Sequence, residues 1–474
     1  MPSLNWPRSV KRREEWEQAA ARLQAGELAL LALWGEPGFA HMAVMERGTY
    51  AGAVLSVECA ANRYPAVGRV HAPAIRPERA LRDLLGLEPE GLPDTRPWLR
   101  HGAGYRFLPA EGESLHQIPV GPVHAGIIEP GHFRFTANGE TVVRLEERLG
   151  YAHKGVDALM AGAPLERAAA LAGRVSGDST VAFSLAFAQA AEAALEADIP
   201  PRAVWLRALL AELERLANHF GDIGAVCNDA AFAIMHAQFG LLRERVLRSA
   251  HACFGHRLMM DRVVPGGLSC DLPPEGTQRL RALLAQLREI FPDLVEVYEN
   301  TASLKDRTVG TGILAPALAR QYAAGGFVGR ASGRRFDARR TPGYAPYEAL
   351  QFEVPTVEAG DVNARVWIRI REVEQSLALI EQILARLPAG PHRAPSVARA
   401  AVGAREGVAL VEGFRGDVFA WVRIAPDGRV ERCHLRDPSW FQWPLLEAAI
   451  EGNIVADFPL CNKSFNCSYS GHDL

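Results

Sequence analysis

The sequence lacks long hydrophobic runs. No stretch approaches the about 18 consecutive apolar residues that mark a candidate membrane-spanning helix. The N-terminal segment MPSLNWPRSVKRREEWEQ also has no apolar core of the kind found in signal peptides. We therefore expect a cytoplasmic chain that neither spans a membrane nor carries its own export signal.

Cysteine is scarce, and no block of one charge sign is present. The seven cysteines are an odd number scattered along 474 residues, which excludes a disulfide framework and is typical of a reducing compartment. The 52 Lys and Arg residues nearly balance the 55 Asp and Glu residues, for a formal charge of -3. Without a basic stretch, nucleic acid is excluded as a partner.

What remains is ordinary globular composition, with 48% hydrophobic and 23% charged residues, in a chain longer than one typical domain. The pattern predicts an α+β protein in two parts. Residues 1–112 form a small α/β domain, with a helix at 12–25, strands at 28–33 and 51–57, and a helix that opens at Pro77. Residues 113–474 form a helix-rich body with small peripheral sheets.

Apolar residues recur at helical spacing through most of the second part. They predict helices at 164–172, 181–197, 202–221, 239–260, 276–291 and 370–387. Gly221 is expected to end the third of these helices. Earlier in the chain, Asn138-Gly139 predicts a hairpin turn between a strand around Phe133 and a strand at 141–145.

The segment 118–135, IPVGPVHAGIIEPGHFRF, brings two histidines and a carboxylate together between turn signals. His124, Glu129 and His132 are therefore expected on tight loops, where a rigid sheet commonly supports chemistry. Histidine and carboxyl groups in a buried cleft suit proton transfer near neutral pH. Locally, the same pattern is also explained by histidines that cap turns and a Glu129 that points to solvent.

This segment, followed by RLGYAHKGVDALM at 148–160, resembles the large subunit of energy-converting membrane nickel-iron hydrogenases and its relative, the quinone-site subunit of complex I. The resemblance implies a hydrogenase-large-subunit-like body for residues 113–474. The stretch PERALRDLLGLEPEGLPDTRPWL at 77–99 resembles the 30-kDa subunit of complex I, although Leu92 replaces a family histidine. The chain then resembles a natural fusion of two subunits. An amphipathic helix followed by a Pro-rich linker explains the same stretch without that role.

At the positions of the metal ligands the chain departs from the hydrogenase pattern. The family motif R-x-C-x-x-C corresponds to Arg174, Ser176 and Ser179, and the C-terminal C-x-x-C corresponds to Cys467 and Ser470. One thiol and three hydroxyls are a poor set of donors for a soft metal site. We therefore expect no nickel-iron centre and no cofactor bound by this chain, with an iron-sulfur cluster in a partner subunit.

A quinone site and a different metal site are two other possibilities, and the sequence matches each of them only in part. The complex I motif R-x-D-Y corresponds to Arg174-Val175-Ser176-Gly177, so the tyrosine that contacts the quinone in that family is missing. Cys461 and Cys467, with five residues between them, are a third possibility as an unorthodox metal site, although the usual ligand spacings are shorter.

Three further segments resemble the family, and each is also explained by a purely structural or solvent-exposed role. Asn218 and His219 match E-L-x-R-I-x-N-H and are expected to make buried structural hydrogen bonds. The loop 331–340, ASGRRFDARR, matches a family loop and is equally explained as a solvated basic loop. Asp361 and Arg365 are expected to be structural.

The resemblance implies a cytoplasmic subunit, peripheral on the inner face of the cell membrane, in a complex that couples electron transfer to ion translocation. Its partners would be a small iron-sulfur subunit and antiporter-like membrane subunits, with a quinone as a further ligand. The candidate catalytic residues are His124, Glu129, His132, Asp178 and Arg415, the last in a family-type E-x-x-R-G-D motif. Of these, His124, Glu129 and Asp178 are the candidates for proton transfer. Two alternatives stay open: a non-catalytic structural or coupling subunit, and a quinone-site subunit of the NADH-quinone oxidoreductase type.

Overall fold

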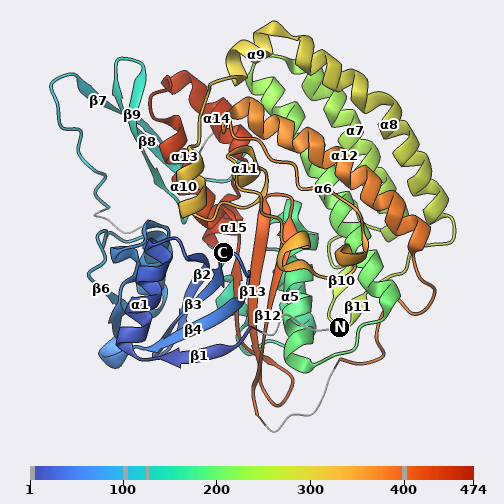
Figure 1. The fold of residues 1–474 in the computed structure, drawn as a ribbon, viewed down its shortest axis with the longest axis horizontal. Helices are drawn as coiled ribbons and strands as arrows, with labels where there is room; N and C mark the ends of the chain where they lie inside the picture. The colour runs from blue at the N-terminus through green and yellow to red at the C-terminus, as the bar shows by residue number, and fades with distance from the viewer. Residues whose placement is uncertain (1–5, 100–104, 124–127, 398–402) are drawn as a thin grey trace.

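The computed structural model describes residues 6–99, 105–123, 128–397 and 403–474. A small N-terminal sheet with short helices lies beside a larger body of long helices, and further small sheets lie between and at the edge of these parts (Figure 1). The expectation of mixed helix and sheet, with the sheets small, is confirmed.

The N-terminal part is built on a four-stranded sheet in the order β1-β4-β3-β2. Its elements are β1 (Arg8–Lys11), α1 (Arg13–Gln24), β2 (Leu28–Glu36), β3 (Phe39–Glu46) and β4 (Gly52–Glu58). β1 runs parallel to β4 and the other pairs are antiparallel. Helix α1 turns Trp16 and Leu23 into the core against β2, so the predicted helix and both predicted strands are confirmed.

A second, smaller pairing follows. β5 (Arg63–Pro65) pairs in parallel with β6 (Glu88–Glu90), and α2 (Ile75–Leu85) lies between them in sequence. The helix begins two residues before Pro77, because a 3-10 turn at Ala72–Ala74 leads directly into it.

The antiparallel sheet β7-β8-β9 projects from the body (Figure 1). It consists of β7 (Leu115–Val120), β8 (His132–Asn138) and β9 (Thr141–Arg148), with Gly139 at φ 57° in the predicted hairpin turn. His132 is the first residue of β8 and pairs with Arg148 across the sheet. The prediction that His132 lies on a loop is therefore wrong.

The body consists mainly of five long helices: α5 (Thr180–Leu195), α6 (Pro201–Asp229), α7 (Ala233–Phe254), α8 (Gly276–Asn300) and α12 (Val362–Arg386). Shorter helices are α3 (Val156–Met160), α4 (Leu165–Ala172), α9 (Ala302–Thr308), α10 (Pro316–Gln321) and α11 (Gly326–Ala331). The two-stranded sheet of β10 (Val263–Val264) and β11 (Gly267–Leu268) follows α7.

Gly221 does not end its helix, contrary to the prediction, because α6 continues to Asp229. A Cβ at Gly221 would lie 3.0 Å from Cδ of Arg243, and a Cβ at Gly224 would lie 3.0 Å from Cβ of Phe239. Both of those neighbours belong to α7. The glycines therefore serve close packing of two helices and not termination.

The C-terminal part returns to the middle of the molecule. β12 (Arg405–Gly413), β13 (Gly416–Ile424) and β14 (Val430–Arg436) form an antiparallel sheet, and α5 packs against β12 and β13. The chain ends with α13 (Ser439–Ile450), α14 (Phe458–Phe465) and α15 (Tyr469–Asp473).

The two ends of the chain meet at a joint between the N-terminal sheet and this C-terminal sheet. Trp34 lies 5.6 Å from Trp421 and stacks on His434 at 5.2 Å, measured between ring centroids. Arg423 donates to both carboxylate oxygens of Glu36, at 2.6 and 2.9 Å. Burial alone would raise the pKa of Glu36, but the hydrogen bonds from His41 and Arg423 lower it to about 2.

Limited proteolysis tests the division of the chain near residue 112. Among the described residues, β1 to β6 pair only with one another and β7 to β14 only with one another. We expect first cleavage between Pro109 and Leu115, a largely exposed stretch, and we expect the two fragments to stay together through the joint until they are denatured. A first cut inside the four-stranded sheet would contradict this division.

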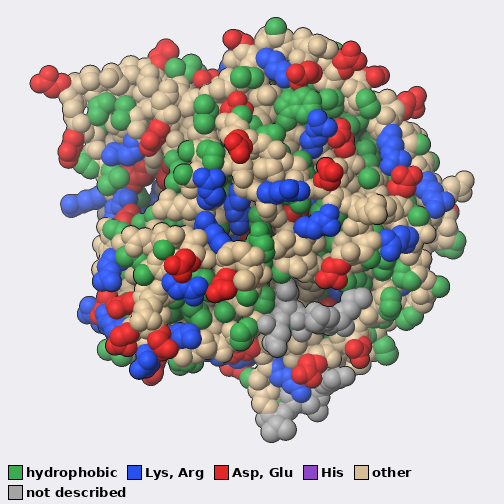
Figure 2. Space-filling view, in the orientation of Figure 1, with side chains coloured by type: hydrophobic (Ala, Val, Ile, Leu, Met, Phe, Trp, Pro, Cys, Tyr) green, Lys and Arg blue, Asp and Glu red, His purple; other side chains and the backbone are tan. Residues whose placement is uncertain are grey.

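No helix among the described residues is long and apolar enough to cross a membrane. On the face shown in Figure 2, basic and acidic side chains are interspersed, as the near balance of charges predicts.

Candidate functional site

An ion pair between Asp178 and Arg415 forms the centre of the candidate site. Arg415 donates from two different nitrogens to the two oxygens of Asp178, at 2.7 and 2.6 Å. Burial opposes ionisation of Asp178, but Arg415 holds the pKa of this carboxyl below its usual value. The two residues are 237 positions apart in sequence, so only the fold brings them together.

Arg415 occupies a two-residue turn between β12 and β13, because Gly413 pairs with Gly416 across the hairpin. The turn packs against the start of α11. A Cβ at Gly326, where φ is 58°, would lie 2.1 Å from the Arg415 carbonyl oxygen. Gln442 donates to the same carbonyl at 2.8 Å. This clamp fixes the backbone from which the guanidinium reaches Asp178.

Serine hydroxyls surround the ion pair. Ser176 donates to Asp178 at 2.9 Å, and the Oγ atoms of Ser176 and Ser468 lie 3.0 Å apart. Ser179 lies between Asp178, at 3.3 Å, and Arg415, at 3.0 Å. The structure therefore brings Ser468, which sequence reasoning did not select, to the position facing Ser176. Ser470 contributes its backbone N–H, which donates to Glu129 at 3.0 Å.

The thiols of the C-terminal segment do not offer thiolates. Cys461 and Cys467 are both free and buried. Burial raises the pKa of Cys461 to about 11 and raises that of Cys467 well above its ordinary value. No group of three or more His, Cys, Asp or Glu side chains suited to a metal ion occurs among the described residues. With one thiol among the four family positions and the hydroxyls of Ser176 and Ser179 engaged in hydrogen bonds, this donor set does not fit a nickel-iron centre.

Other predicted site residues lie apart from the ion pair. Arg174 points outward and pairs with Asp261 at 2.6 and 2.8 Å. His132 packs its ring on Phe107, with centroids 4.6 Å apart. Glu129 is exposed in this chain, so the prediction of a buried cleft around it is wrong for the chain by itself. His124 lies outside the described residues.

Several residues that support the site were not predicted to do so. Lys154 donates to the carbonyls of Arg174 and Val175, at 2.8 and 2.7 Å, directly before Ser176. Asn466, whose side chain donates to Asp222 at 2.8 Å, supplies a carbonyl to Arg415. Lys154 could have been selected from the sequence, because it lies in the segment 148–160 that resembles the family.

Asn218 and His219 make the buried hydrogen bonds expected of them. Asn218 donates to the Asp178 carbonyl at 2.7 Å, and His219 Nε2 lies 2.7 Å from Glu372. Asp361 caps α12 by accepting from the Ala364 N–H, and Arg365 is fully buried, so both are structural as expected.

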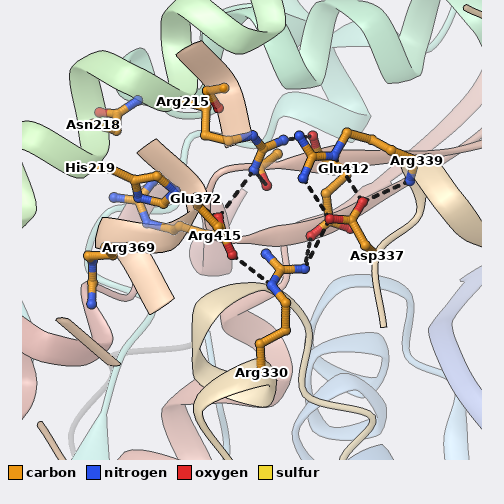
Figure 3. Close-up of polar contacts among 12 residues, drawn as sticks. Arg215, Asn218, His219, Arg330, Asp337, Arg339, Arg369, Glu372, Glu412 and Arg415 are labelled. Carbon is orange, nitrogen blue, oxygen red and sulfur yellow. Dashed lines mark hydrogen bonds and ion pairs between the residues drawn. The ribbon is translucent and has the colours of Figure 1, made fainter. Parts of the chain in front are cut away.

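The loop 331–340 is not a solvated basic loop, since Asp337 and Arg339 are almost completely buried. Together with residues of α6, α11, α12 and β12 they form a closed ionic cluster (Figure 3). Its members are Glu212, Arg215, His219, Arg330, Asp337, Arg339, Glu372 and Glu412. Local sequence could not reveal this cluster, because its carboxylates come from four separate segments.

Comparison with known proteins places this frame among subunits of respiratory complexes. Residues 230–406 match the family described as respiratory-chain NADH dehydrogenase, 49 Kd subunit. Formate hydrogenlyase subunit 5 of Escherichia coli (strain K12) is 32% identical over 459 residues, which cover 90% of this chain and 80% of that protein. A subunit of NADH-quinone oxidoreductase from Roseiflexus sp. (strain RS-1) is 31% identical and is covered over 94% of its length by 72% of this chain.

A solved structure, that of the archaeal membrane-bound sulfane sulfur reductase, contains a chain with the same frame. The similarity has a TM-score of 0.70 at 26% sequence identity and covers 76% of this chain and 99% of that one. Similar chains thus occur in proteins named for different substrates, and one of them belongs to a membrane-bound complex.

Proposed function

Because this chain belongs to the family that includes formate hydrogenlyase subunit 5 and the matched NADH-quinone oxidoreductase protein, we propose that it is a peripheral subunit of a membrane-bound, hydrogenase-related oxidoreductase complex. In this proposal the complex couples electron transfer to ion translocation. The chain lies on the inner face of the membrane, beside a small iron-sulfur subunit and antiporter-like membrane subunits.

The observation that carries the proposal is the Asp178–Arg415 pair. It occupies the region where the resemblance places a metal centre in hydrogenases, and serine hydroxyls surround it. A bidentate ion pair with hydroxyls can orient a polar substrate and move protons, but it does not itself carry electrons. We therefore assign electron delivery to the iron-sulfur partner and proton handling to this chain.

The docking surface proposed for that partner lies beside Glu129. Val123 is 73% exposed and Ile128 is 42% exposed, and both precede Glu129, which accepts from the Ser470 N–H of α15. Exposed apolar residues next to a polar site are typical of a protein interface. A partner seated there would exclude water from Glu129, which the chain by itself leaves exposed.

A structural or coupling role is the second candidate. The hydroxyls of Ser176 and Ser179 already have hydrogen-bond partners within the site. Ser176 bonds to Asp178 and Ser468, and Ser179 bonds to Asp178 and Arg415. Such a closed set of hydrogen bonds would also serve a former active site that now only holds subunits together. Turnover of the complex with and without the ion pair separates the two roles.

Purification of the complex through a tag on this chain tests the proposed function. We expect an iron-sulfur subunit and membrane subunits to copurify from solubilised membranes, with iron present. We expect nickel below about 0.1 per chain, because a nickel site needs soft thiolate ligands in a fixed geometry and this chain has too few of them. Elemental analysis of the active complex gives both metals.

Two results would contradict the proposal in different ways. If the chain purifies alone from the soluble fraction, the proposal that it belongs to a membrane-bound complex is contradicted, whatever the metal content of the chain. If an active complex contains about one nickel per chain, membership of the complex is supported, but the assignment of a nickel-free site is overturned.

A further inference from the structure

In the buried ionic cluster, carboxyl groups outnumber guanidinium groups. Arg369 and Arg415, which Figure 3 also labels, pair with Asp222 and Asp178 outside the cluster. Three arginines, Arg215, Arg330 and Arg339, face four acids, Glu212, Asp337, Glu372 and Glu412. The side chains of all seven residues are at most 2% exposed. An unpaired buried charge is strongly unfavourable, and such a group instead takes up or loses a proton.

Three of the four acids have complete sets of partners. Asp337 accepts from two nitrogens of Arg339, at 2.9 and 2.6 Å. Glu212 accepts from Arg339 at 2.8 Å, and from the hydroxyls of Tyr347 and Ser376 at 2.7 and 2.6 Å. Glu372 binds Arg330 and His219, each at 2.7 Å. These contacts favour the ionised forms.

Glu412 has the weakest compensation. It accepts from Nη1 of Arg330 at 2.9 Å and from the Ala338 N–H at 2.9 Å. The same Nη1 also faces Asp337 at 3.4 Å, so two carboxylates share one nitrogen. Arg215 acts on Glu412 only through its charge, because it donates to the backbone carbonyls of Glu412 and Gly413 and not to the carboxylate.

The remaining charged groups near Glu412 make their hydrogen bonds to other partners. Asp417, opposite Glu412 in the hairpin, binds Arg436 at 2.5 Å. Arg334 donates to the Ala324 carbonyl at 2.8 Å, and its pKa responds more to Asp417 than to Glu412. The Tyr344 hydroxyl accepts from the Glu412 N–H at 3.3 Å. Burial lowers the pKa of His219, so its ring adds no positive charge to the cluster. Three guanidinium groups then face four carboxyl groups, and the cluster becomes neutral when one carboxyl holds a proton.

We propose that Glu412 is a buried proton-binding site that takes up and releases one proton in step with the charge at the Asp178–Arg415 site. The site rests on the geometry of the cluster alone, whereas its coupling to turnover rests on the proposed function. Burial, followed by the Asp337 charge, raises the pKa of Glu412 to about 7. The carboxyl is thus protonated below about pH 7 and ionised above it.

Two rigid elements connect this carboxyl to the site. Glu412 and Arg415 belong to one hairpin, three residues apart, with Glu412 in the cluster and Arg415 on Asp178. On α6, His219 binds Glu372 while the adjacent Asn218 holds the Asp178 carbonyl. A negative charge gained at the site would favour protonation of Glu412, and the proton would come from water.

Infrared difference spectroscopy of the purified chain, between about pH 6 and pH 8, tests the proton-binding site without any activity. We expect the carbonyl band of a protonated carboxyl to disappear with a midpoint of about 7 and to shift in D2O. Burial also raises the pKa of Glu78 and Glu214 to about 8, so the variant Glu412→Gln identifies the band. The exposed Glu358→Gln is the matched control.

The outcomes are distinct. Loss of one carboxyl band in Glu412→Gln alone supports the site, and an unchanged difference spectrum in that variant overturns it. If Glu412→Gln does not fold, Glu412→Asp keeps an acid, and a band with a displaced midpoint supports the site. No carboxyl titrating in this range in the unmodified chain overturns it directly.

Coupling is tested separately in the intact complex. If Glu412 takes up a proton during turnover, the pH profile of activity changes slope at about pH 7. We expect this change to be lost in Glu412→Gln and retained in Glu358→Gln. A profile identical in Glu412→Gln overturns the coupling. The infrared result still decides the site itself, so failure of the proposed function and failure of the proton-binding site are distinguishable.

Discussion

Replacing Arg330 with methionine is expected to destabilise the folded chain by roughly 3–5 kcal/mol, the cost of removing one partner from a buried ion pair. Arg330 is completely buried and contacts Glu372 at 2.7 Å and Glu412 at 2.9 Å. Methionine fills a similar volume, so the loss comes from carboxylates left without a cation. Urea unfolding of the purified chain measures the change in the free energy of unfolding.

Arg371→Met is the matched control, because Arg371 lies on the exposed face of α12 with its side chain 58% exposed. We expect that variant to stay within about 0.5 kcal/mol of the unmodified chain. An Arg330→Met protein as stable as the control would mean that the carboxylates are neutralised by protonation, and its infrared spectrum would then show more protonated acid.

Replacing Glu129 with glutamine is expected to lower the coupled activity of the intact complex by ~100-fold or more, the scale of lost general acid-base catalysis. The carboxylate accepts the Ser470 N–H at 3.0 Å. Glutamine retains a carbonyl oxygen for this bond and removes only the titratable proton. Assembly with the iron-sulfur partner should therefore persist, as copurification would show.

The control for this variant is Glu140→Gln, an exposed residue at the tip of the β8–β9 hairpin. Unchanged turnover in Glu129→Gln would leave Glu129 as a residue that only anchors α15. Lost assembly with turnover retained in the residual complex would instead favour the structural role.

Much of the fold could be predicted from local patterns. Helices α1, α4 and α5 and the β8–β9 turn follow from apolar periodicity, a proline before the helix and Asn-Gly, all of which act within a few residues. The errors arose where distant packing overrides local preference. Gly221 sits inside α6, where α7 packs closely against it. The helix predicted to end at residue 291 is α8, which continues through Pro292 to Asn300.

The candidate site shows the same division. The serines at 176 and 179 and the isolated Cys467 are visible in sequence, and the proposal that this chain holds no thiolate-bound metal centre rests on them. Sequence could not indicate that Ser468 faces Ser176, because a turn ahead of α15 sets which hydroxyl points inward.

The sequence by itself determined the chemistry that is available to this protein: its family, its balanced charge and the residue types of the site, including serines at three of the four positions of the family's metal-binding cysteines. Only the tertiary structure decided which charges are buried together. Glu212, Arg330, Glu372 and Glu412 lie on four different elements. The pKa of a carboxyl depends on its distance from other charges and on its exclusion from water, and neither quantity exists until the chain has folded.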